Sequence, residues 1–242
     1  MAHQYLARDL PAEPGSLVVL DAAESRHAAT VARLRLGEEV RLSNGKGLQA
    51  SAVTVAVAPR RVELKVIELT QLHDPRPELW LVQALAKGGR DELAVQAATE
   101  LGASVIIPLA ANRSVSKWDA DKAHKGRERW QSIADEASKQ SLRAFIPEVR
   151  ALHQSAELGG LDAQLLLLVP GASASLLDVR PSEDLRPLAL VVGPEGGLAP
   201  EEIASLESAG ARSVRLGREV LRTSTAGPAA LAVLNAQLGR WA

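Results

Sequence analysis

Beyond Leu79 the chain alternates between short apolar runs and segments with helical character, and few folds accommodate this alternation. The run LWLVQAL (79–85) is typical of a buried strand. RDELAVQAATELG (90–102) carries acidic residues in its first turn and a glycine at its end, as a helix does, and SVIIPL (104–109) is the next strand. A strand, a helix and a strand in this order form a right-handed βαβ unit. The sequence therefore predicts an α/β domain built on a mainly parallel sheet.

The same alternation continues to the end of the chain. We predict further strands at 164–170, 187–192 and 213–216, and helices at 118–142, 174–179 and 200–210. In the last of these helices Pro200 suits the first helical position, and the two glutamates that follow complement the helix dipole. A final helix of small residues is predicted to begin near Pro228.

The first 70 residues follow a different pattern, which predicts a separate small β-rich domain. The segments 40–43, 50–57 and 60–69 are rich in β-branched residues, and turns are expected at Asn44-Gly45 and Ala58-Pro59. Ser25 is the predicted N-cap of a short helix that ends near Gly37. The segment QLHDPRPE (71–78) is the best boundary, so we predict domains at 1–72 and 73–242.

Composition excludes several classes of protein. The formal charge is −1 over 242 residues, so any surface for nucleic acid must be local. The chain has no cysteine, and its five histidines lack the spacing of metal ligands, so no metal is predicted. No G-x-S-x-G nucleophile motif occurs. The longest wholly aliphatic run, 165–169, is too short to span a bilayer, and the first residues do not resemble a signal peptide. We expect a cytoplasmic protein that makes no membrane contact.

Two glycine-containing segments, VVGPEGGL (191–198) and VRLGREVLRTSTAG (214–227), each follow a predicted strand and precede a predicted helix. Ligands of open α/β sheets bind at such strand ends. Gly193, Gly196 and Gly197 leave room for a ligand or for another chain segment, although glycines in an isolated GPEGG segment more often only shape a turn. Neither segment has the G-x-G-x-x-G or the Walker spacing, so a dinucleotide or nucleoside triphosphate site is not indicated.

These segments, together with KGGRDELAVQAATELGASVIIPLAANRSV (87–115) and HAATVARLRLGEEVRLSNGKG (27–47), resemble a known family. The chain is similar to the SPOUT-class methyltransferases that modify N3 of a uridine in small-subunit (16S) ribosomal RNA. The resemblance implies a trefoil-knotted C-terminal domain, a PUA-like N-terminal domain and S-adenosyl-L-methionine as cofactor. It also implies a homodimer whose partner is small-subunit ribosomal RNA or the assembled small subunit.

The resemblance also implies which residues form the site. In this family the cofactor is held mainly by the backbone of three loops, which correspond here to Leu168, Val169, Pro170 and Gly171; to Val192, Gly193, Glu195, Gly196 and Gly197; and to Leu216, Gly217, Val220, Leu221, Arg222, Thr223 and Ala226. Arg222, Glu195 and Thr223 are the catalytic candidates. From the residues alone, Glu195 is equally well a solvated turn carboxylate or the partner of a cation. Capping a helix is the simpler role for Thr223, and a hydroxyl that faces the pyrimidine is the more specific one.

One position departs from the family pattern. The family usually reads L-R-T-E-T-A, whereas this chain has Ser224 where the glutamate is expected. N3 of uridine must lose its imide proton to react, and a positioned base helps this loss. Either Glu195 or Glu219 takes the proton, or loss to water suffices because Arg222 stabilises the developing anion. The departure keeps two alternatives open: a non-catalytic RNA-binding or ribosome-assembly factor that retains the fold, and a SPOUT enzyme that acts on another RNA site.

The basic residues expected to contact RNA occur in both predicted domains. The N-terminal set lies in or beside the family block, and Arg113 and Arg143 fall in C-terminal blocks; the residues are His27, Arg33, Arg35, Arg41, Lys46, Arg113 and Arg143. For the mixed charges of the helix at 118–142, a solvated face is the simpler interpretation. Phosphate contacts need only cationic side chains, so these residues suffice to position RNA without reading its sequence.

Overall fold

The computed structural model describes residues 3–241, which form two compact units. One unit comprises Met1–Asp74 together with Ser138–Ile146, and the other comprises Pro75–Ala137 and Pro147–Ala242. The division near residue 74 lies close to the predicted boundary. The segment 138–146, which the predicted domains assign to the C-terminal part, packs within the N-terminal unit instead.

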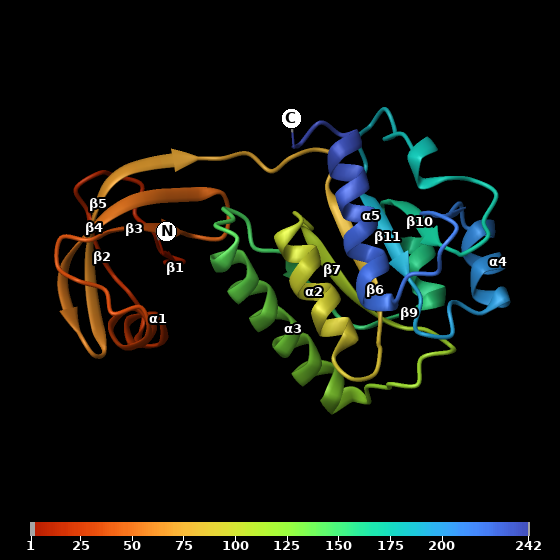
Figure 1. Ribbon diagram of the computed structural model, residues 1–242, viewed down its shortest axis with the longest axis horizontal. Helices are drawn as coiled ribbons and strands as arrows, with labels where there is room; N and C mark the ends of the chain where they lie inside the picture. The colour runs from red at the N-terminus through yellow and green to blue at the C-terminus, as the bar shows by residue number, and fades with distance from the viewer. Residues whose placement is uncertain (1–2, 242) are drawn as a thin grey trace. The chain divides into compact units, whose positions relative to one another are not determined.

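The N-terminal unit is a five-stranded sheet in the order β1-β3-β4-β5-β2 (Figure 1). Its strands are β1 (Gln4–Leu6), β2 (Leu17–Val19), β3 (Glu39–Ser43), β4 (Leu48–Ala58) and β5 (Arg61–Gln71). β4 and β5 form a long antiparallel hairpin with two irregularities in register. Alternate residues of these strands pack into one apolar core around the fully buried side chains of Tyr5, Leu42 and Leu64.

The short helix of this unit begins and ends earlier than predicted. α1 spans Ala22–Arg26, and a wider π-helical turn, η1, follows at His27–Val31. The N-cap is Asp21, whose carboxylate accepts hydrogen bonds from the N–H groups of residues 23 and 24. The prediction of Ser25 as cap was wrong: this side chain is fully buried and its hydroxyl donates to the carbonyl of Leu20. The sequence did not identify Asp21 as the cap because Asp and Ser are both favoured N-cap residues.

The inserted segment 138–146 is held in the N-terminal unit by hydrogen bonds and by a buried ion pair. Lys139 Nζ lies 2.7 Å from Glu24 Oε1, and the two side chains are 8% and 9% exposed. The carbonyl of Ala144 accepts a hydrogen bond from the N–H of Gly47, and the amide of Gln4 donates to the carbonyl of Arg143. These contacts complete the unit with residues much later in the chain: Lys139 and Glu24 are 115 positions apart, and Arg143 and Gln4 are 139 apart.

The C-terminal unit contains a parallel sheet in the order β12-β10-β11-β6-β7-β8, with β9 also paired to β7. The strands are β6 (Leu79–Ala84), β7 (Val105–Ala110), β8 (Glu148–Val149), β9 (His153–Gln154), β10 (Gln164–Leu168), β11 (Leu188–Val192) and β12 (Arg212–Val214). The central strands β6 and β11 are buried along their whole length because helices cover both faces of the sheet. The predicted parallel sheet is confirmed.

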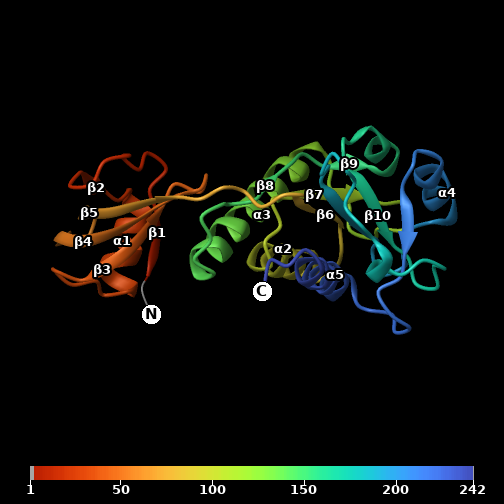
Figure 2. The same ribbon diagram turned by 90° about the horizontal axis from the view of Figure 1, so that it is seen from above.

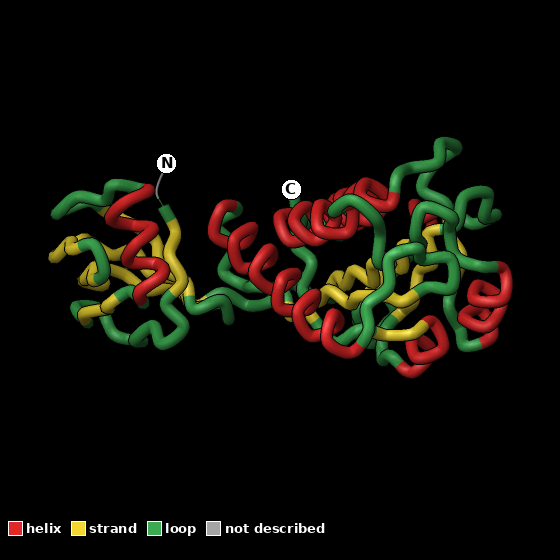
Figure 3. The backbone as a smooth tube through the Cα atoms, turned by 90° about the horizontal axis from the view of Figure 1, so that it is seen from below, coloured by secondary structure: helices red, strands yellow, loops and turns green. Residues whose placement is uncertain are grey.

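Helices cover both faces of this sheet (Figures 2 and 3). α2 (Arg90–Glu100), the first part of α3 (Ala120–Gln140), the 3₁₀ turn η3 (Leu176–Asp178) and α5 (Thr223–Gln237) pack on one face. α4 (Pro200–Ser208) and the 3₁₀ helix η2 (Ser155–Gly160) pack on the other. In the described part of the chain, no helix is long and apolar enough to cross a membrane.

Two helix predictions in this unit need correction. The segment 174–179 forms only the short turn η3. α5 begins at Thr223, five residues before the predicted start, and Pro228 lies inside it. Proline lacks the N–H that a helix interior needs, so Pro228 was predicted to lie at the start of the helix. It is tolerated inside α5 because the packing of the helix compensates for the lost hydrogen bond. The trefoil knot stays a prediction.

Candidate functional site

The ends of β10, β11 and β12 open into three loops that line one cavity of about 640 Å³. A cavity of this volume suits a small organic molecule or cofactor. Its lining combines the apolar strand ends with the glycine loop and the start of α5; the lining residues are Arg90, Arg113, Leu168, Val169, Pro170, Val192, Gly193, Pro194, Glu195, Gly196, Gly197, Leu198, Ile203, Val214, Leu216, Gly217, Glu219, Val220, Leu221, Arg222, Thr223 and Ala226.

The structure brings the predicted cofactor residues together around this cavity. Of those predicted residues, all of them described by the structure, Gly171 is the one that does not line it. Sequence reasoning missed Arg90 and Ile203. Arg90 stands directly after the strand end LAKGG, and that position was a usable signal. Ile203 lies one turn into α4 and faces the cavity, and nothing in the sequence distinguishes it from a core residue.

The loop GPEGG (193–197) is shaped by its first glycine. A Cβ on Gly193 would lie 2.7 Å from the backbone nitrogen of Leu198, so no larger residue fits without moving the loop. Gly197 has φ +69°, a left-handed conformation that favours glycine. A Cβ on Gly196 would make only ordinary contact, at 3.6 Å, with the side chain of Arg113. The tight turn therefore depends on residues 193 and 197.

Two arginines that line the cavity hold the GPEGG loop: Arg90 begins α2, and Arg113 lies in the segment after β7. Arg90 Nη1 lies 3.1 Å from Glu195 Oε1, and the N–H of Lys87 donates to the same oxygen at 3.2 Å. Arg113 Nη1 donates to the carbonyl of Gly196 at 3.0 Å. Of the two interpretations left open for Glu195, the structure therefore favours the partner of a cation. Arg113, predicted to contact RNA, lies on the rim of the cavity.

These contacts make the carboxylate of Glu195 a weaker base than an ordinary glutamate. A hydrogen bond from its own N–H, together with those from Lys87 and Arg90, lowers the pKa of its carboxyl below the ordinary value. A carboxylate with a lowered pKa binds a proton less readily than an ordinary one, and proton transfer is most effective when the pKa is near the working pH. Glu195 is therefore better suited to fixing the loop than to taking a proton from a substrate.

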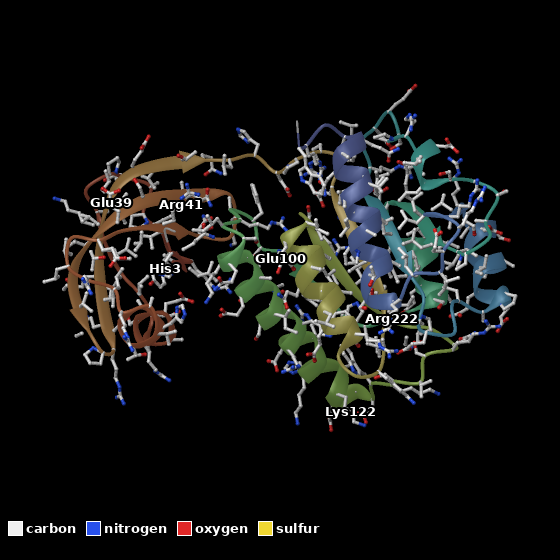
Figure 4. All side chains as sticks on the ribbon, in the orientation of Figure 1. His3, Glu39, Arg41, Glu100, Lys122 and Arg222 are labelled. Carbon is white, nitrogen blue, oxygen red and sulfur yellow. The ribbon has the colours of Figure 1, made fainter. Side chains whose placement is uncertain are left out.

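The third loop, residues 216–222, is exposed, and we call it the Arg222 loop. Val220 is 76% exposed and Leu221 38%. Within residues 3–241, the backbone of 216–221 makes no hydrogen bond to another segment. Arg222 is the N-cap residue of α5 and lines the cavity, and its carbonyl accepts bonds from the N–H groups of Thr225 and Ala226 (Figure 4).

Thr223 is the buried end of this loop. It is 6% exposed, its hydroxyl donates to the carbonyl of Gly193 at 2.9 Å, and the amide of Gln83 donates to the hydroxyl oxygen at 2.8 Å. Its side chain does not cap the helix, so the capping interpretation was wrong. The one hydroxyl proton is already used within the protein, which leaves none for a pyrimidine.

The start of α5 carries no carboxylate in its first turn, because Ser224 stands there. The remaining carboxylate that lines the cavity besides Glu195 is Glu219, an exposed residue of the Arg222 loop. The first turn of α5 thus adds no carboxylate to those of Glu195 and Glu219, and the positive end of its helix dipole lies at the cavity lining.

The other residues predicted to contact RNA belong to the N-terminal unit. Arg33, Arg35, Arg41 and Lys46 are exposed. His27 Nδ1 is buried and has no hydrogen-bond partner among the described residues, and its ring meets the edge of Tyr5. Arg143 is half-buried in the inserted segment and was wrongly grouped with the C-terminal domain. No cluster of three potential metal ligands occurs within residues 3–241.

The cavity fits a cofactor such as S-adenosylmethionine. It is lined by backbone of glycine-rich loops, by apolar strand ends and by few charges, and a molecule of that size requires backbone hydrogen-bonding groups at its polar ends. Gly197 has open space where a Cβ would be, and so does Gly171 beside the cavity. No Walker or dinucleotide loop competes for this assignment.

Comparison with known proteins identifies the family. A family model of the RNA methyltransferase domain matches residues 73–235, and one of the RNA methyltransferase PUA domain matches residues 20–67. The ribosomal RNA small subunit methyltransferase E of Mycobacterium bovis is 38% identical over 236 residues, which cover 95% of this chain and 90% of that protein. The chain belongs to the ribosomal RNA small subunit methyltransferase E family.

Other members agree with this assignment. The Bacillus subtilis protein of the same name is 33% identical and covers 88% of each chain. The crystal structure of ribosomal RNA small subunit methyltransferase E from Neisseria gonorrhoeae, bound to S-adenosyl methionine, has a TM-score of 0.87 at 27% identity and covers 98% of both chains. A putative methyltransferase from Legionella pneumophila with bound cofactor has the same TM-score at 30% identity. The predicted family, RNA methyltransferase class and two-domain fold class are confirmed.

Proposed function

We propose that this protein transfers a methyl group from S-adenosylmethionine to N3 of a uridine in small-subunit (16S) ribosomal RNA. The observation that carries the proposal is the single cavity in which the three loops of the family meet, with Arg222 on its lining. When bound there, the cofactor supplies an electrophilic methyl group. The loops at 168–170, 192–197 and 216–226 would hold it, mainly through backbone groups.

In this proposal Arg222 stabilises the substrate. Loss of the imide proton spreads negative charge over N3, O2 and O4 of the pyrimidine, and a guanidinium can donate hydrogen bonds to O2 or O4 while the lone pair of N3 faces the methyl group. The positive end of the α5 dipole, which lies at the cavity lining, acts in the same direction. Because the charge develops during the reaction, these groups favour the transition state over the bound uridine.

The proton of N3 has two acceptors in this chain. Glu219 lines the cavity and is solvated, and water enters from the exposed side of the Arg222 loop. The contacts of Glu195 with Arg90 and Lys87 argue against Glu195. We therefore assign proton loss to Glu219 or to water, and Ser224 takes no part in it.

We also propose that the exposed cations of the N-terminal unit and Arg113 position the RNA through its phosphates, and that the protein works in the cytoplasm as a homodimer. The small residues of α5 and the exposed Val220 and Leu221 support pairing. Light scattering at micromolar concentration should give twice the chain mass of 25.6 kDa. A monomer with full activity would contradict this part of the proposal.

Mass spectrometry of small-subunit RNA tests the function directly. RNA from a strain that lacks the protein should lose one methylated uridine, and purified protein with the cofactor should restore it, on free RNA or on the assembled subunit. The reaction should be strongly weakened by salt, because phosphate contacts release counterions. If the methyl group appears at another nucleotide, the enzyme acts on a different RNA site. If binding to RNA persists without any methylation, the protein is an assembly factor.

A further inference from the structure

One polar side chain lies where the core would otherwise be apolar. Gln83 is at the end of β6, fully buried, and its neighbours on the same face of the strand are Leu81 and Leu85. Its Oε1 atom has no hydrogen-bond partner in the described part of the chain. A buried amide with an unpaired oxygen costs stability compared with leucine, so its presence here calls for a function of its donor group.

The donor group of Gln83 connects two of the three loops around the cavity. Its Nε2 donates to Thr223 Oγ1 at 2.8 Å and to the carbonyl of Ala84 at 3.0 Å. The hydroxyl of Thr223 donates in turn to the carbonyl of Gly193 at 2.9 Å. A chain of two hydrogen bonds therefore runs from the central strand through the start of α5 to the start of the GPEGG loop.

This connection fixes the C-terminal end of the Arg222 loop, whereas the hydrogen bonds of Arg215 fix its N-terminal end. Its residues 216–221 make no backbone hydrogen bond to another segment within residues 3–241, and Thr223 is the first buried residue after them. Arg222 lies between the exposed loop and the buried hydroxyl, and its own carbonyl is fixed by the first turn of α5. The position of its guanidinium is therefore set from the Thr223 side.

We infer that Gln83 is a positioning residue of the methyltransferase site, which acts through the hydroxyl of Thr223 to fix both the GPEGG loop and Arg222. Thr223 is then a positioning residue as well, rather than a group that contacts the pyrimidine. A donor, not an acceptor, suits position 83: the hydroxyl has one proton, an acceptor at position 83 would compete with Gly193 for it, and the N–H of Gln83 leaves it for Gly193 while fixing the hydroxyl oxygen. The inference rests on the proposed function for one of its tests only, the measurement of methyl transfer.

The variant Gln83→Leu tests the inference, with Asn235→Leu as its matched control. Asn235 is a buried amide of α5, the helix that begins at Thr223, and its Nδ2 donates to the carbonyls of Leu101 and Leu231, far along α5 from the cavity. Both variants should lower the melting temperature. Only Gln83→Leu should weaken S-adenosylmethionine binding in calorimetry and slow single-turnover methylation at saturating cofactor, each by about tenfold, as expected for one lost hydrogen bond.

A second set of variants covers the case in which Gln83→Leu does not fold. Thr223→Val should weaken cofactor binding at least as much, Thr223→Ser should recover most of that loss, and Gln83→Leu should add nothing further in the Thr223→Val background. Hydrogen exchange gives a measurement without cofactor. The amides of residues 225 and 226 should exchange faster in Gln83→Leu, whereas Asn235→Leu should affect only the C-terminal end of α5.

Normal cofactor affinity and normal exchange at 225 and 226 in a folded Gln83→Leu protein would overturn the inference, because the amide would then be a packing group only. Additive losses in the Gln83→Leu, Thr223→Val double variant would overturn it too, since the two residues would act separately. If the wild-type protein binds cofactor but methylates no RNA, the proposed function fails, and the affinity and exchange measurements still decide the role of Gln83.

Discussion

Gly193→Ala is the substitution that most directly probes the architecture of the site. The added Cβ would lie 2.7 Å from the backbone nitrogen of Leu198, about 0.7 Å inside the 3.4 Å at which ordinary contact begins. The obstacle is main chain, since the carbonyl carbon of Gly197, in the same peptide unit as that nitrogen, is 2.9 Å away. No side-chain rotation relieves this overlap, so the loop itself must move.

The expected cost follows from that displacement. Forcing an extra methyl group against packed backbone typically costs about 1–3 kcal/mol. Part of the cost appears as lost stability and part as lost pre-organisation of the loop. Because about 1.4 kcal/mol corresponds to a tenfold change in an equilibrium constant, we expect S-adenosylmethionine to bind about 10- to 100-fold more weakly. The hydrogen bond from Thr223 to the carbonyl of residue 193 should weaken together with the loop.

The neighbouring glycine provides the matched control. A Cβ on Gly196 would contact only the side chain of Arg113, at 3.6 Å, and the backbone there is not left-handed. Calorimetry should therefore show a much smaller loss for Gly196→Ala than for Gly193→Ala, with both proteins folded by circular dichroism. If the alanine at 196 is the more harmful one, the glycines are present to admit the ligand, and our account of the turn is incorrect.

Three further predictions concern charge. Arg222→Ala should lower turnover by roughly two to four orders of magnitude with cofactor affinity nearly unchanged. Ser224→Ala should have little effect on either. Loss of cofactor binding in Arg222→Ala would place that side chain in the cofactor pocket instead. Lys139→Met leaves Glu24 as an unpaired buried charge and should reduce the free energy of unfolding by about 3–5 kcal/mol in urea denaturation, and adding Glu24→Gln should restore much of it. Burial, with the carboxylates of Glu24 and Glu38, raises the pKa of Tyr5 to about 12. Because this folded value lies above the unfolded value of about 10, the contribution of Tyr5 to stability should be complete below about pH 10 and should fall as the pH rises toward 12. Tyr5→Phe should abolish that part of the loss.

The sequence predicted the architecture of the C-terminal unit well because burial there follows a strict pattern. Strands β6 and β11 are buried on both faces and read as continuous apolar runs, and α2 shows an acidic first turn and a terminal glycine. Such local signals do not depend on what the segment packs against. The strand ends and their glycines likewise located the cavity, since parallel strands bring their carboxyl ends to one edge of the sheet.

Helix boundaries were less predictable because several residues satisfy the same local rule. Asp21 and Ser25 are both good caps, and only the burial of Ser25 beneath the sheet decides between them. Pro228 resembles a first-turn residue, but α5 begins at Thr223, whose hydroxyl is held by Gln83 and Gly193. At the first place tertiary contacts choose between two equally good caps, and at the second they outweigh a cost of about 3 kcal/mol for proline inside a helix.

By itself the sequence determined which segments are strands, which loops carry the glycines and which family the chain resembles, because these follow from residue order alone. Only the tertiary structure decided the partners of the polar groups. Segment 138–146 joins the N-terminal unit through a buried ion pair formed across more than a hundred residues, Glu195 is held by Arg90, and the hydroxyl of Thr223 is used between Gln83 and Gly193. A hydrogen bond or an ion pair depends on distance and direction between groups far apart in the chain, and periodicity along the chain carries no information about either.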